Sequence, residues 1–261
     1  MKNFEIGIIG GTGGIGRWFA DFFKREGYAV HVSGRKIGMD MPAMAEKCDV
    51  VIVSVPIGVT CEIIEQVGPH MRRGTLLMDF TSLKVEPVKF MLEHSVSEVI
   101  GTHPLFGPDI DTLAGQNVVL CPARTERWIH WLRDVLKRNG AHVVETTPER
   151  HDRLMTIVQG LNHLNTIAMG MVLGKMGADL SELKDFATPV FNIKIGILKK
   201  IFDNNPRLYA EIITSNPDIN ELVDIYEKTL SELKELIDKR DAGGLTEMIR
   251  KNALKLEIRK T

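Results

Sequence analysis

The chain has 261 residues, of which 44% are hydrophobic and 26% are charged, and its 33 Lys and Arg against 34 Asp and Glu give a formal net charge of -1. This composition is that of an ordinary globular protein and excludes the disordered and fibrous classes. The balanced charge leaves no large basic field for nucleic acid or an anionic membrane, so we expect neither partner and instead a small-molecule ligand. At about 150 residues per domain, the length predicts two domains.

The three cysteines, Cys48, Cys61 and Cys121, form no CxxC pair. We therefore expect no disulfide framework, no metal site and a reducing compartment. The amino terminus lacks the basic and then apolar layout of a secretory signal, which predicts a cytoplasmic protein. Residues 154–174 carry no Asp, Glu, Lys or Arg, but polar residues within them favour a buried helix of a soluble domain over a membrane span.

The first half of the chain predicts a sheet. Short apolar runs rich in β-branched residues predict seven strands, at residues 4–9, 29–33, 50–55, 76–80, 96–100, 118–120 and 142–144. Helical periodicity fills several of the gaps, and a short helix is expected at residues 41–47. Because strands alternate with helices, we expect an α/β fold with a mostly parallel sheet covered on both faces.

The pattern changes at Thr147-Pro148, which is typical of a helix start. Only helices are expected beyond it, at residues 149–176, 180–203, 206–215, 219–239 and 243–258. We therefore expect an α/β domain over residues 1–150, followed by an all-helical domain over residues 151–261.

The helical domain is also expected to form a homodimer. Its helices around residues 154–174 and 186–202 are more apolar than one small core needs. Gly170 and Gly174 permit close approach of a second helix. Contact between two copies of the chain would cover these apolar faces.

A glycine-rich loop follows the first predicted strand and precedes an amphipathic helix. Gly11, Gly13 and Gly16 satisfy GxGxxG, and in this position the pattern is specific for dinucleotide binding. The first glycine permits the tight turn, the second lets a pyrophosphate approach the backbone, and the third lets helix and strand pack closely. We therefore expect a Rossmann-type domain in which the whole loop contacts the cofactor, through Gly11, Thr12, Gly13, Gly14, Ile15 and Gly16.

The end of the second predicted strand is expected to select the cofactor. NAD-specific sites place an Asp or Glu about 20 residues beyond the loop, where it binds the ribose 2'-hydroxyl. Here Ser33, Arg35 and Lys36 stand in that place, and the next carboxylate is Asp40. A hydroxyl and two cations suit a 2'-phosphate, because the arginine fork offers paired donors to phosphate oxygens. The sequence therefore predicts NADP in preference to NAD.

Two segments that follow predicted strands carry the remaining chemistry, DFTSLK at residues 79–84 and THPLFGP at residues 102–108. Ligands of open α/β sheets bind beyond the carboxyl ends of the strands, so His103, Ser82 and Lys84 are expected to face the nicotinamide. His103 is the acid–base candidate. An imidazole with a pKa of about 6.5 can accept a hydroxyl proton at neutral pH while hydride leaves the same carbon.

Four long segments resemble the prephenate dehydrogenase family of tyrosine biosynthesis: DFTSLK, THPLFGPDIDTLAGQNVVL, HDRLMTIVQGLNH and FATPVFNIKIGILKKIFDNNPRLYAEIITSNP. Archaeal members and the dehydrogenase part of bacterial chorismate mutase-prephenate dehydrogenases are the most similar. The resemblance covers nearly the whole chain. It implies oxidative decarboxylation of prephenate to 4-hydroxyphenylpyruvate, hydride transfer to the nicotinamide, and a homodimer with each cleft near the dimer interface. The length leaves no room for a further mutase or regulatory domain, so we expect a stand-alone dehydrogenase.

The resemblance also implies roles for three residues. His103 is the base that takes the ring-hydroxyl proton, and Ser82 hydrogen-bonds near the substrate hydroxyl and the nicotinamide. Lys84 is a partner for a carboxylate or an electrostatic partner within the active site. Since loss of carbon dioxide makes the ring aromatic, the enzyme must mainly position and deprotonate its substrate.

Substrate contacts are expected from the helical domain. Gln159 and His163 are four residues apart on one predicted helix, so they share a face, and the family has a histidine matching His163 at its substrate site. Family members commonly place an arginine where this chain has Lys200. Lysine keeps the charge but loses the bidentate fork, so Lys200 is a candidate for binding a substrate carboxylate, with Lys194 or Arg153 as alternatives. This departure leaves both prephenate and arogenate open as substrates.

Two alternative functions would account for part of the sequence. Deazaflavin-dependent NADP reductases also begin with an apolar strand and a GGTGxxG loop, but that resemblance covers residues 1–36 only. It accounts for neither THPLFGP nor QGLNH. A non-enzymatic NADP sensor would keep the loop but would need no acid–base histidine facing the cofactor. His103 therefore favours the dehydrogenase.

Overall fold

The structure is a computed structural model that describes residues 4–35 and 37–257. The chain forms two compact units, residues 1–216 and residues 217–261. The first unit holds the sheet and the helices that follow it up to α10 (Pro206–Thr214), and the second is a pair of helices. No helix among the described residues is both long enough and apolar enough to cross a membrane.

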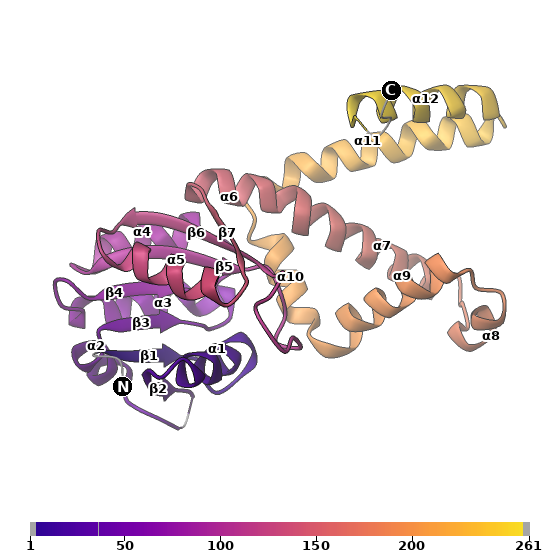
Figure 1. The fold of residues 1–261 in the computed structure, drawn as a ribbon. Coiled ribbons are helices and arrows are strands. Elements are labelled where there is room, and N and C mark those ends of the chain that lie inside the picture. Colours follow the sequence, from indigo (N-terminus) through magenta and orange to yellow (C-terminus); the bar gives the residue numbers. More distant parts are fainter. Residues whose placement is uncertain (1–3, 36, 258–261) are drawn as a thin grey trace. The chain divides into compact units, whose positions relative to one another are not determined.

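The first unit is built on a seven-stranded sheet (Figure 1). In chain order the strands are β1 (Glu5–Ile9), β2 (Ala29–Ser33), β3 (Val50–Val53), β4 (Leu76–Asp79), β5 (Glu98–Pro104), β6 (Asn117–Arg124) and β7 (His142–Glu145). Their order in space is β2-β1-β3-β4-β5-β6-β7, and only the β5–β6 pair is antiparallel. The predicted mostly parallel, Rossmann-type sheet is confirmed.

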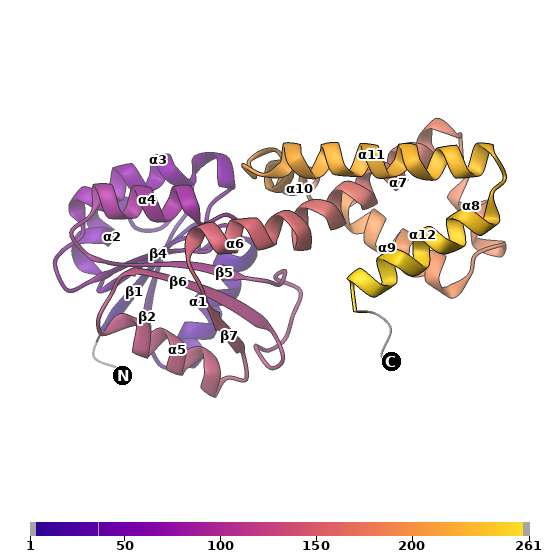
Figure 2. The same cartoon turned by 90° about the horizontal axis from the view of Figure 1, so that it is seen from above.

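Helices cover both faces of the sheet (Figure 2). Each face has its own apolar core. Phe19 and Ile52 belong to the core on one face, and Met91 and Val53 belong to the core on the other. Successive residues of a strand point to opposite faces, so strands buried on both sides consist of continuous apolar runs. The covering helices are α1 (Gly14–Arg25), α2 (Met41–Lys47), α3 (Ile57–Val67), α4 (Val85–His94) and α5 (Trp128–Arg138), with a 3-10 turn, η1 (Gly68–His70), after α3.

The strand order reverses at β1, which lies between β2 and β3. In doubly wound sheets this point opens a crevice beyond the carboxyl ends of two neighbouring strands, where nucleotides bind. The backbones after β1 and β3 are in close contact there, since a Cβ on Gly10 would lie 1.9 Å from the carbonyl oxygen of Ser54. The glycine-rich loop is therefore at the switch point of the sheet.

Strand β5 is longer than predicted and contains His103. The prediction ended the strand at residue 100 and placed His103 on a loop, and this was wrong. β6 runs antiparallel beside β5, and His103 pairs with Val119. An antiparallel neighbour supplies backbone partners to residues beyond the parallel part of the sheet, so the strand continues to Pro104. His103 is thus held by the sheet itself.

The helices after β7 follow the predicted change of pattern with one break. They are α6 (Pro148–Met155), the π-helical turn η2 (Thr156–Leu161), α7 (Asn162–Lys175), α8 (Leu180–Asp185), α9 (Pro189–Lys199), the π-helical turn η3 (Lys200–Asn204) and α10. The predicted single helix over residues 180–203 was wrong. Proline disfavours helical backbone in the residue before it, and Thr188 instead caps α9 by accepting a hydrogen bond from Phe191 N at 3.2 Å.

Helix α7 is less buried than predicted. None of its residues is fully buried in the single chain, and Met171 and Val172 are exposed. The helix packs against the α9 region at Gly170, where a Cβ would lie 2.5 Å from the ring of Phe202. Gly170 thus permits a close approach within one chain, whereas a Cβ on Gly174 would meet nothing within 4 Å.

The second unit consists of α11 (Ile219–Asp238) and α12 (Ala242–Lys255). The turn between them passes through Arg240 at φ 52°. Asp241 then caps α12 by accepting a hydrogen bond from Gly244 N at 2.8 Å. The predicted helices at residues 219–239 and 243–258 match this pair closely, except that residue 258 lies outside the described residues.

Candidate active site

The loop between β1 and α1 makes a tight turn with little room for side chains. A Cβ on Gly11 would lie 2.9 Å from the carbonyl oxygen of Ile8, and one on Gly16 would lie 2.4 Å from that of Gly10. At Gly13, the N-cap of α1, an added Cβ would meet nothing within 4 Å. The outer glycines therefore close the turn and pack the helix, while the middle one leaves open space before the helix N-terminus. These features fit the pyrophosphate of a dinucleotide.

The other loop residues occupy different environments. Gly14 is exposed and has φ 48°, a backbone conformation that favours glycine. The Ile15 side chain packs against the apolar core, which leaves its backbone for a cofactor. Thr12 lies beside the next loop, because a Cβ on Gly34 would be 2.6 Å from Thr12 Oγ1. The loops after β1 and β2 therefore meet.

The end of β2 presents no carboxylate in the position typical of NAD sites. Ser33 is buried, and its carbonyl oxygen accepts a hydrogen bond from Gly10 N at 2.8 Å. Arg35 is exposed, and Lys36 lies outside the described residues. Asp40 caps α2 by accepting a hydrogen bond from Ala43 N at 3.3 Å. The first carboxylate after β2 is thus engaged at a helix terminus.

A buried ion pair joins the carboxyl ends of β4 and β5. Lys84 and Asp79 are both fully buried and contact each other. Lys84 Nζ also donates to Thr102 O at 2.9 Å, while Asp79 accepts from the backbone N–H of Thr81 at 2.9 Å and of Thr102 at 3.3 Å. A direct contact between Lys84 and a substrate carboxylate would require the ammonium to leave this pair. The geometry therefore suits the electrostatic role.

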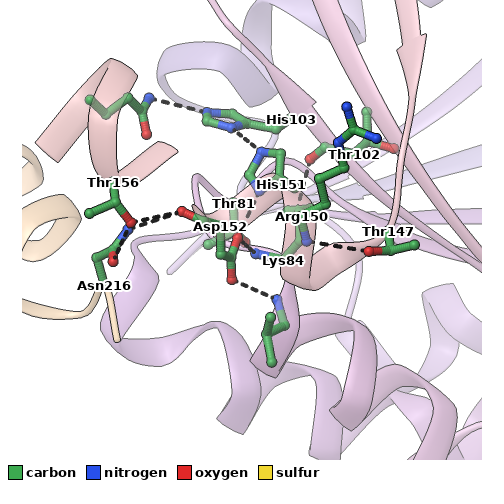
Figure 3. Close-up of polar contacts among 12 residues, drawn as sticks. Thr81, Lys84, Thr102, His103, Thr147, Arg150, His151, Asp152, Thr156 and Asn216 are labelled. Carbon is green, nitrogen blue, oxygen red and sulfur yellow. Dashed lines mark hydrogen bonds and ion pairs between the residues drawn. The ribbon is translucent and has the colours of Figure 1, made fainter. Parts of the chain in front are cut away.

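A second buried chain of hydrogen bonds runs from His103 to the start of α4 (Figure 3). His103 Nδ1 lies 2.9 Å from His151 Nε2, and His151 Nδ1 lies 2.7 Å from Asp152 Oδ1. The Asp152 carboxylate also accepts hydrogen bonds from the backbone N–H groups of Lys84 at 2.8 Å and Val85 at 2.9 Å. Asp152 therefore binds the N-terminus of α4, where a negative charge is stabilised.

Burial determines the protonation state of the candidate base. It lowers the pKa of His103 well below the ordinary value, and the nearby charges of His151 and Lys84 act in the same direction. His103 is therefore neutral at neutral pH, which is the form that can accept a proton. Burial also lowers the pKa of His163.

Of the three buried side-chain atoms without a hydrogen-bond partner among the described residues, one is on Thr102 and the other two are on η2 and α7. Gln159, in the π-helical turn η2, has its Nε2 3.4 Å from His103 Nε2, and its buried Oε1 is unpaired. The buried Nδ1 of His163 is also unpaired, while the His163 ring packs edge-on against Tyr209 with centroids 4.9 Å apart. Buried polar atoms are nearly always hydrogen-bonded, so these two atoms are candidate ligand contacts.

The remaining predicted residues are less closely tied to His103. Ser82 is half-buried, and its hydroxyl makes no hydrogen bond within the described ranges. Lys200 has a side chain 53% exposed, and its Nζ lies 3.7 Å from Asp109 on the loop after β5. Lys194 and Arg153 are exposed. The structure thus brings Lys84 and Gln159 to His103 and places Lys200 beside the loop that follows the same strand.

The contacts that His103 and Lys84 make with their buried partners were not predicted from the sequence. Asp79 stands at the end of a wholly apolar strand, and a carboxylate in that setting indicates a buried ion pair. His151 and Asp152 are adjacent, but His103 is 48 positions from His151. No local pattern reports a contact over that distance.

The comparisons with known proteins agree with the fold. The model of the prephenate dehydrogenase nucleotide-binding domain matches residues 19–145, and that of the prephenate dehydrogenase dimerization domain matches residues 147–251. A probable arogenate/prephenate dehydrogenase from Methanocaldococcus jannaschii is 40% identical over 96% of this chain and 60% of its own length. The T-protein of Haemophilus influenzae is 33% identical over 95% of this chain and 66% of its own length.

A solved structure shares the fold. The crystal structure of prephenate dehydrogenase from A. aeolicus with hydroxyphenyl propionate and NAD+ covers 99% of both chains with a TM-score of 0.75 at 22% identity. The chain spans 60% and 66% of the length of the two curated relatives named above. With two family models matching consecutive stretches of the sequence, the chain belongs to the prephenate dehydrogenase family.

Proposed function

We propose that this chain catalyses the oxidative decarboxylation of prephenate to 4-hydroxyphenylpyruvate with NADP as the hydride acceptor. The observation that carries the proposal is a buried, neutral histidine, His103, whose Nε2 lies 3.4 Å from the side-chain amide of Gln159. Family membership indicates the class of reaction, and the glycine loop at the switch point supports a dinucleotide.

The proposed chemistry assigns one proton and its path to this chain. His103 Nε2 takes the proton of the ring hydroxyl as that carbon becomes a carbonyl. When bound, the nicotinamide accepts the hydride that leaves the same carbon. Carbon dioxide then departs, its bonding electrons make the ring aromatic, and the phenolate oxygen regains the proton from His103. Aromatisation drives the reaction, so the protein's task is to orient the substrate and hold the proton.

The other site residues receive supporting roles in this proposal. Ser82 hydrogen-bonds near the substrate hydroxyl and the nicotinamide. Gln159 Oε1 and His163 Nδ1, both buried and without a partner among the described residues, contact polar atoms of the substrate. Lys84 acts through its charge, which opposes protonation of His103. Lys200, exposed beside the loop after β5, binds a substrate carboxylate.

The choice of NADP rests on the end of β2. Arg35 is exposed there, and the first carboxylate, Asp40, is engaged as the cap of α2. An arginine without a competing carboxylate suits a ribose 2'-phosphate. The glycine loop, residues 11–16, would hold the pyrophosphate of either cofactor, and the A. aeolicus structure has NAD+. The preference for NADP over NAD in this proposal therefore depends on the residues at the end of β2.

We further propose a dinucleotide-binding domain over residues 1–150, a helical substrate and dimerisation domain over residues 151–261, and a homodimer. The matching dimerization-domain model supports the dimer. Large apolar side chains are also exposed on α7 and α9 of the single chain, namely Met171, Val172, Val190, Ile193 and Ile197. A patch of this kind marks an interface in a protein that carries no membrane span among its described residues. Sedimentation as a monomer at micromolar concentration would contradict the dimer.

The test follows reduction of the nicotinamide by absorbance with each pairing of prephenate or arogenate and NADP or NAD. We expect turnover with prephenate and a higher kcat/KM for NADP. His103→Asn should lower kcat by about 10²- to 10⁴-fold, the usual contribution of a general base. His130→Asn, on the exposed side of α5, is the matched control and should leave kcat unchanged.

Three other results of these assays would contradict part or all of the proposed function. Turnover with arogenate alone would replace the proposed substrate. No turnover with either substrate would overturn the proposed function. A kcat near that of the wild type in His103→Asn would remove His103 as the base.

A further inference from the structure

The hydrogen-bond chain behind His103 ends in a carboxylate whose donors are all identified. Asp152 Oδ1 and Oδ2 accept from the backbone N–H groups of Lys84 and Val85, and Oδ1 also lies 2.7 Å from His151 Nδ1. A backbone N–H can only donate, and an ionised carboxylate can only accept. Asp152 is therefore a fixed acceptor, and the proton on the His151 ring is at Nδ1.

Because Asp152 can only accept, it determines which nitrogen carries the proton in each histidine of this hydrogen-bond chain. In neutral His151 a proton on Nδ1 leaves Nε2 as an acceptor. Nε2 lies 2.9 Å from His103 Nδ1, so the His103 proton is at Nδ1. The lone pair of His103 is then at Nε2, the atom that lies 3.4 Å from the Gln159 amide. This side of the ring is also the one on which Gln159 Oε1 is left without a partner among the described residues.

We propose that His151 and Asp152 are positioning residues that hold His103 in the Nδ1-protonated tautomer and take up the positive charge formed when it acts as a base. This inference rests on the proposed function and assigns two further residues to it. Neither makes contact with the substrate. Both lie on α6 and are buried, with 1% and 3% of their surfaces exposed.

The proton path balances without any further reactant. His103 Nε2 gains the hydroxyl proton, and the proton on His103 Nδ1 passes to His151 Nε2. The positive charge then rests on a ring in contact with the Asp152 carboxylate. After carbon dioxide has left, the two protons move back, and the phenolate oxygen recovers its proton from His103 Nε2. No net proton enters or leaves the chain.

The charges around His103 favour this transfer. Lys84, paired with Asp79 between β4 and α4, opposes a positive charge on His103. Asp152 is in contact with His151 and stabilises a positive charge there. On β6, burial raises the pKa of the Cys121 thiol to about 12, so this group stays neutral. A cation is therefore better placed on His151 than on His103.

Two substitutions of His151 separate positioning from packing. In His151→Gln an amide oxygen can still accept from His103 Nδ1, so kcat should stay within about tenfold of the wild type. His151→Phe keeps the ring volume but removes the acceptor, and kcat should fall by about 100-fold with KM little changed. A purely structural role predicts the reverse order, because phenylalanine is the better filler of an apolar cavity. Phenylalanine equal to or better than glutamine would overturn the proposal.

The pH profile gives a second readout of the same variants. In the proposed path the positive charge that forms when His103 takes up a proton rests on His151, in contact with the Asp152 carboxylate. In His151→Gln the amide can hold the tautomer but cannot take up that proton, so protonation of His103 is less favourable and the acid limb of kcat should move to lower pH. An acid limb that stays in place would contradict a charge shared between the two rings.

The most severe test changes the acceptor at the end of the hydrogen-bond chain into a group that can donate. Asp152→Asn removes the negative charge that stabilises a cation on His151, and it puts an N–H₂ donor in place of one of the two oxygens that accept a backbone N–H. Where that place is Oδ1, the donor faces His151 Nδ1 and forces the proton of both rings onto Nε2, away from Nδ1. Carboxylate-to-amide changes of this kind cost about 10⁴-fold in the serine protease triad. We expect a loss of about 10³- to 10⁴-fold here, with substrate binding retained. A loss below tenfold would show that the tautomer is set in another way.

A measurement on the wild-type protein needs neither turnover nor a variant that folds poorly. Long-range proton–nitrogen NMR of ¹⁵N-histidine-labelled protein identifies which nitrogen of each ring carries the proton. We expect protons on Nδ1 of both His103 and His151, with signals assigned by their loss in His103→Asn and His151→Gln. Protonated Nε2 in neutral His103 would overturn the proposal whatever the outcome of the prephenate assay. Absence of turnover with the expected tautomers would instead count against the proposed function alone.

Discussion

Two regions at the carboxyl edge of the sheet were predicted as parts of one site. They differ in how far contacts within the protein fix the positions of their side chains. At the ends of β4 and β5, His103, Lys84 and Asp79 are buried and hydrogen-bonded to other protein groups. At the end of β2, Arg35 is exposed to solvent. Reactivity is thus prepared in the first region before any ligand binds, whereas selectivity in the second depends on the ligand.

The physical reason is the cost of burying charge. A buried charge without partners is very unfavourable, so the protein must supply those partners and thereby fix geometry and protonation. An exposed arginine loses little by remaining solvated, and its binding geometry forms only when an anion arrives. Substitutions in the buried region should therefore affect the apoprotein, and substitutions in the exposed region should affect only the complex.

The largest effect is expected from breaking the buried ion pair. Lys84→Met leaves the Asp79 carboxylate fully buried without its cation. Removing one partner of such a pair lowers the free energy of unfolding by about 3–5 kcal/mol. Urea denaturation of the apoprotein measures this, with Lys89→Met on the exposed side of α4 as the control. A loss below about 1 kcal/mol, the range of an exposed pair, would remove the distinction between the two regions.

A smaller effect, confined to the complex, is expected at the end of β2. Arg35→Ala should raise the KM for NADP by about tenfold, the value of one charge-assisted hydrogen bond, and leave the KM for NAD within about twofold. The stability of the apoprotein should not change, because the Arg35 side chain is exposed. Arg73→Ala, another exposed cation, is the control. An unchanged KM for NADP would mean that Arg35 is only a solvated charge.

The same contrast explains what the sequence could predict. The helix at Met41–Lys47 and the strand at Ala29–Ser33 were predicted to the residue, because apolar periodicity and turn residues are local signals. His103 was selected as the base from its neighbours in the sequence. Its position inside β5 was missed, because the strand is extended by an antiparallel partner that comes later in the chain.

The inner parts of the site depend on contacts between distant segments. His103 meets His151 only because β5 and α6 pack together, and Asp152 meets the N-terminus of α4 across 67 positions or more. Four-residue spacing placed Gln159 and His163 on one face, but Gln159 belongs to a π-helical turn, where helical spacing changes. The identity of the chemical groups was therefore predictable, while their pairing was not.

The smallest effect is a pH dependence of stability that only the buried region should produce. In the unfolded chain a histidine has a pKa of about 6.5, whereas burial lowers the pKa of His103 in the folded protein. Below about pH 6.5 the unfolded state binds a proton that folded His103 does not, so the free energy of unfolding falls with acidification by at most about 1.4 kcal/mol per pH unit. Above that pH both states are neutral, and this contribution no longer changes.

Urea denaturation of the wild type and of His103→Asn at a series of pH values isolates the contribution of His103 to the free energy of unfolding. The lowered pKa of His163 acts in the same direction, but it is common to both proteins and cancels in the difference. His103 and His151 are hydrogen-bonded to each other, so the difference reports the titration of the pair. We expect a stability difference that is constant above about pH 6.5 and moves in favour of His103→Asn as the pH falls. A stability difference independent of pH would mean that His103 takes up its proton as readily in the folded protein as in the unfolded chain. The neutral state of His103 would then depend on the bound ligand. The buried region would in that respect resemble Arg35, where cofactor selectivity depends on the ligand.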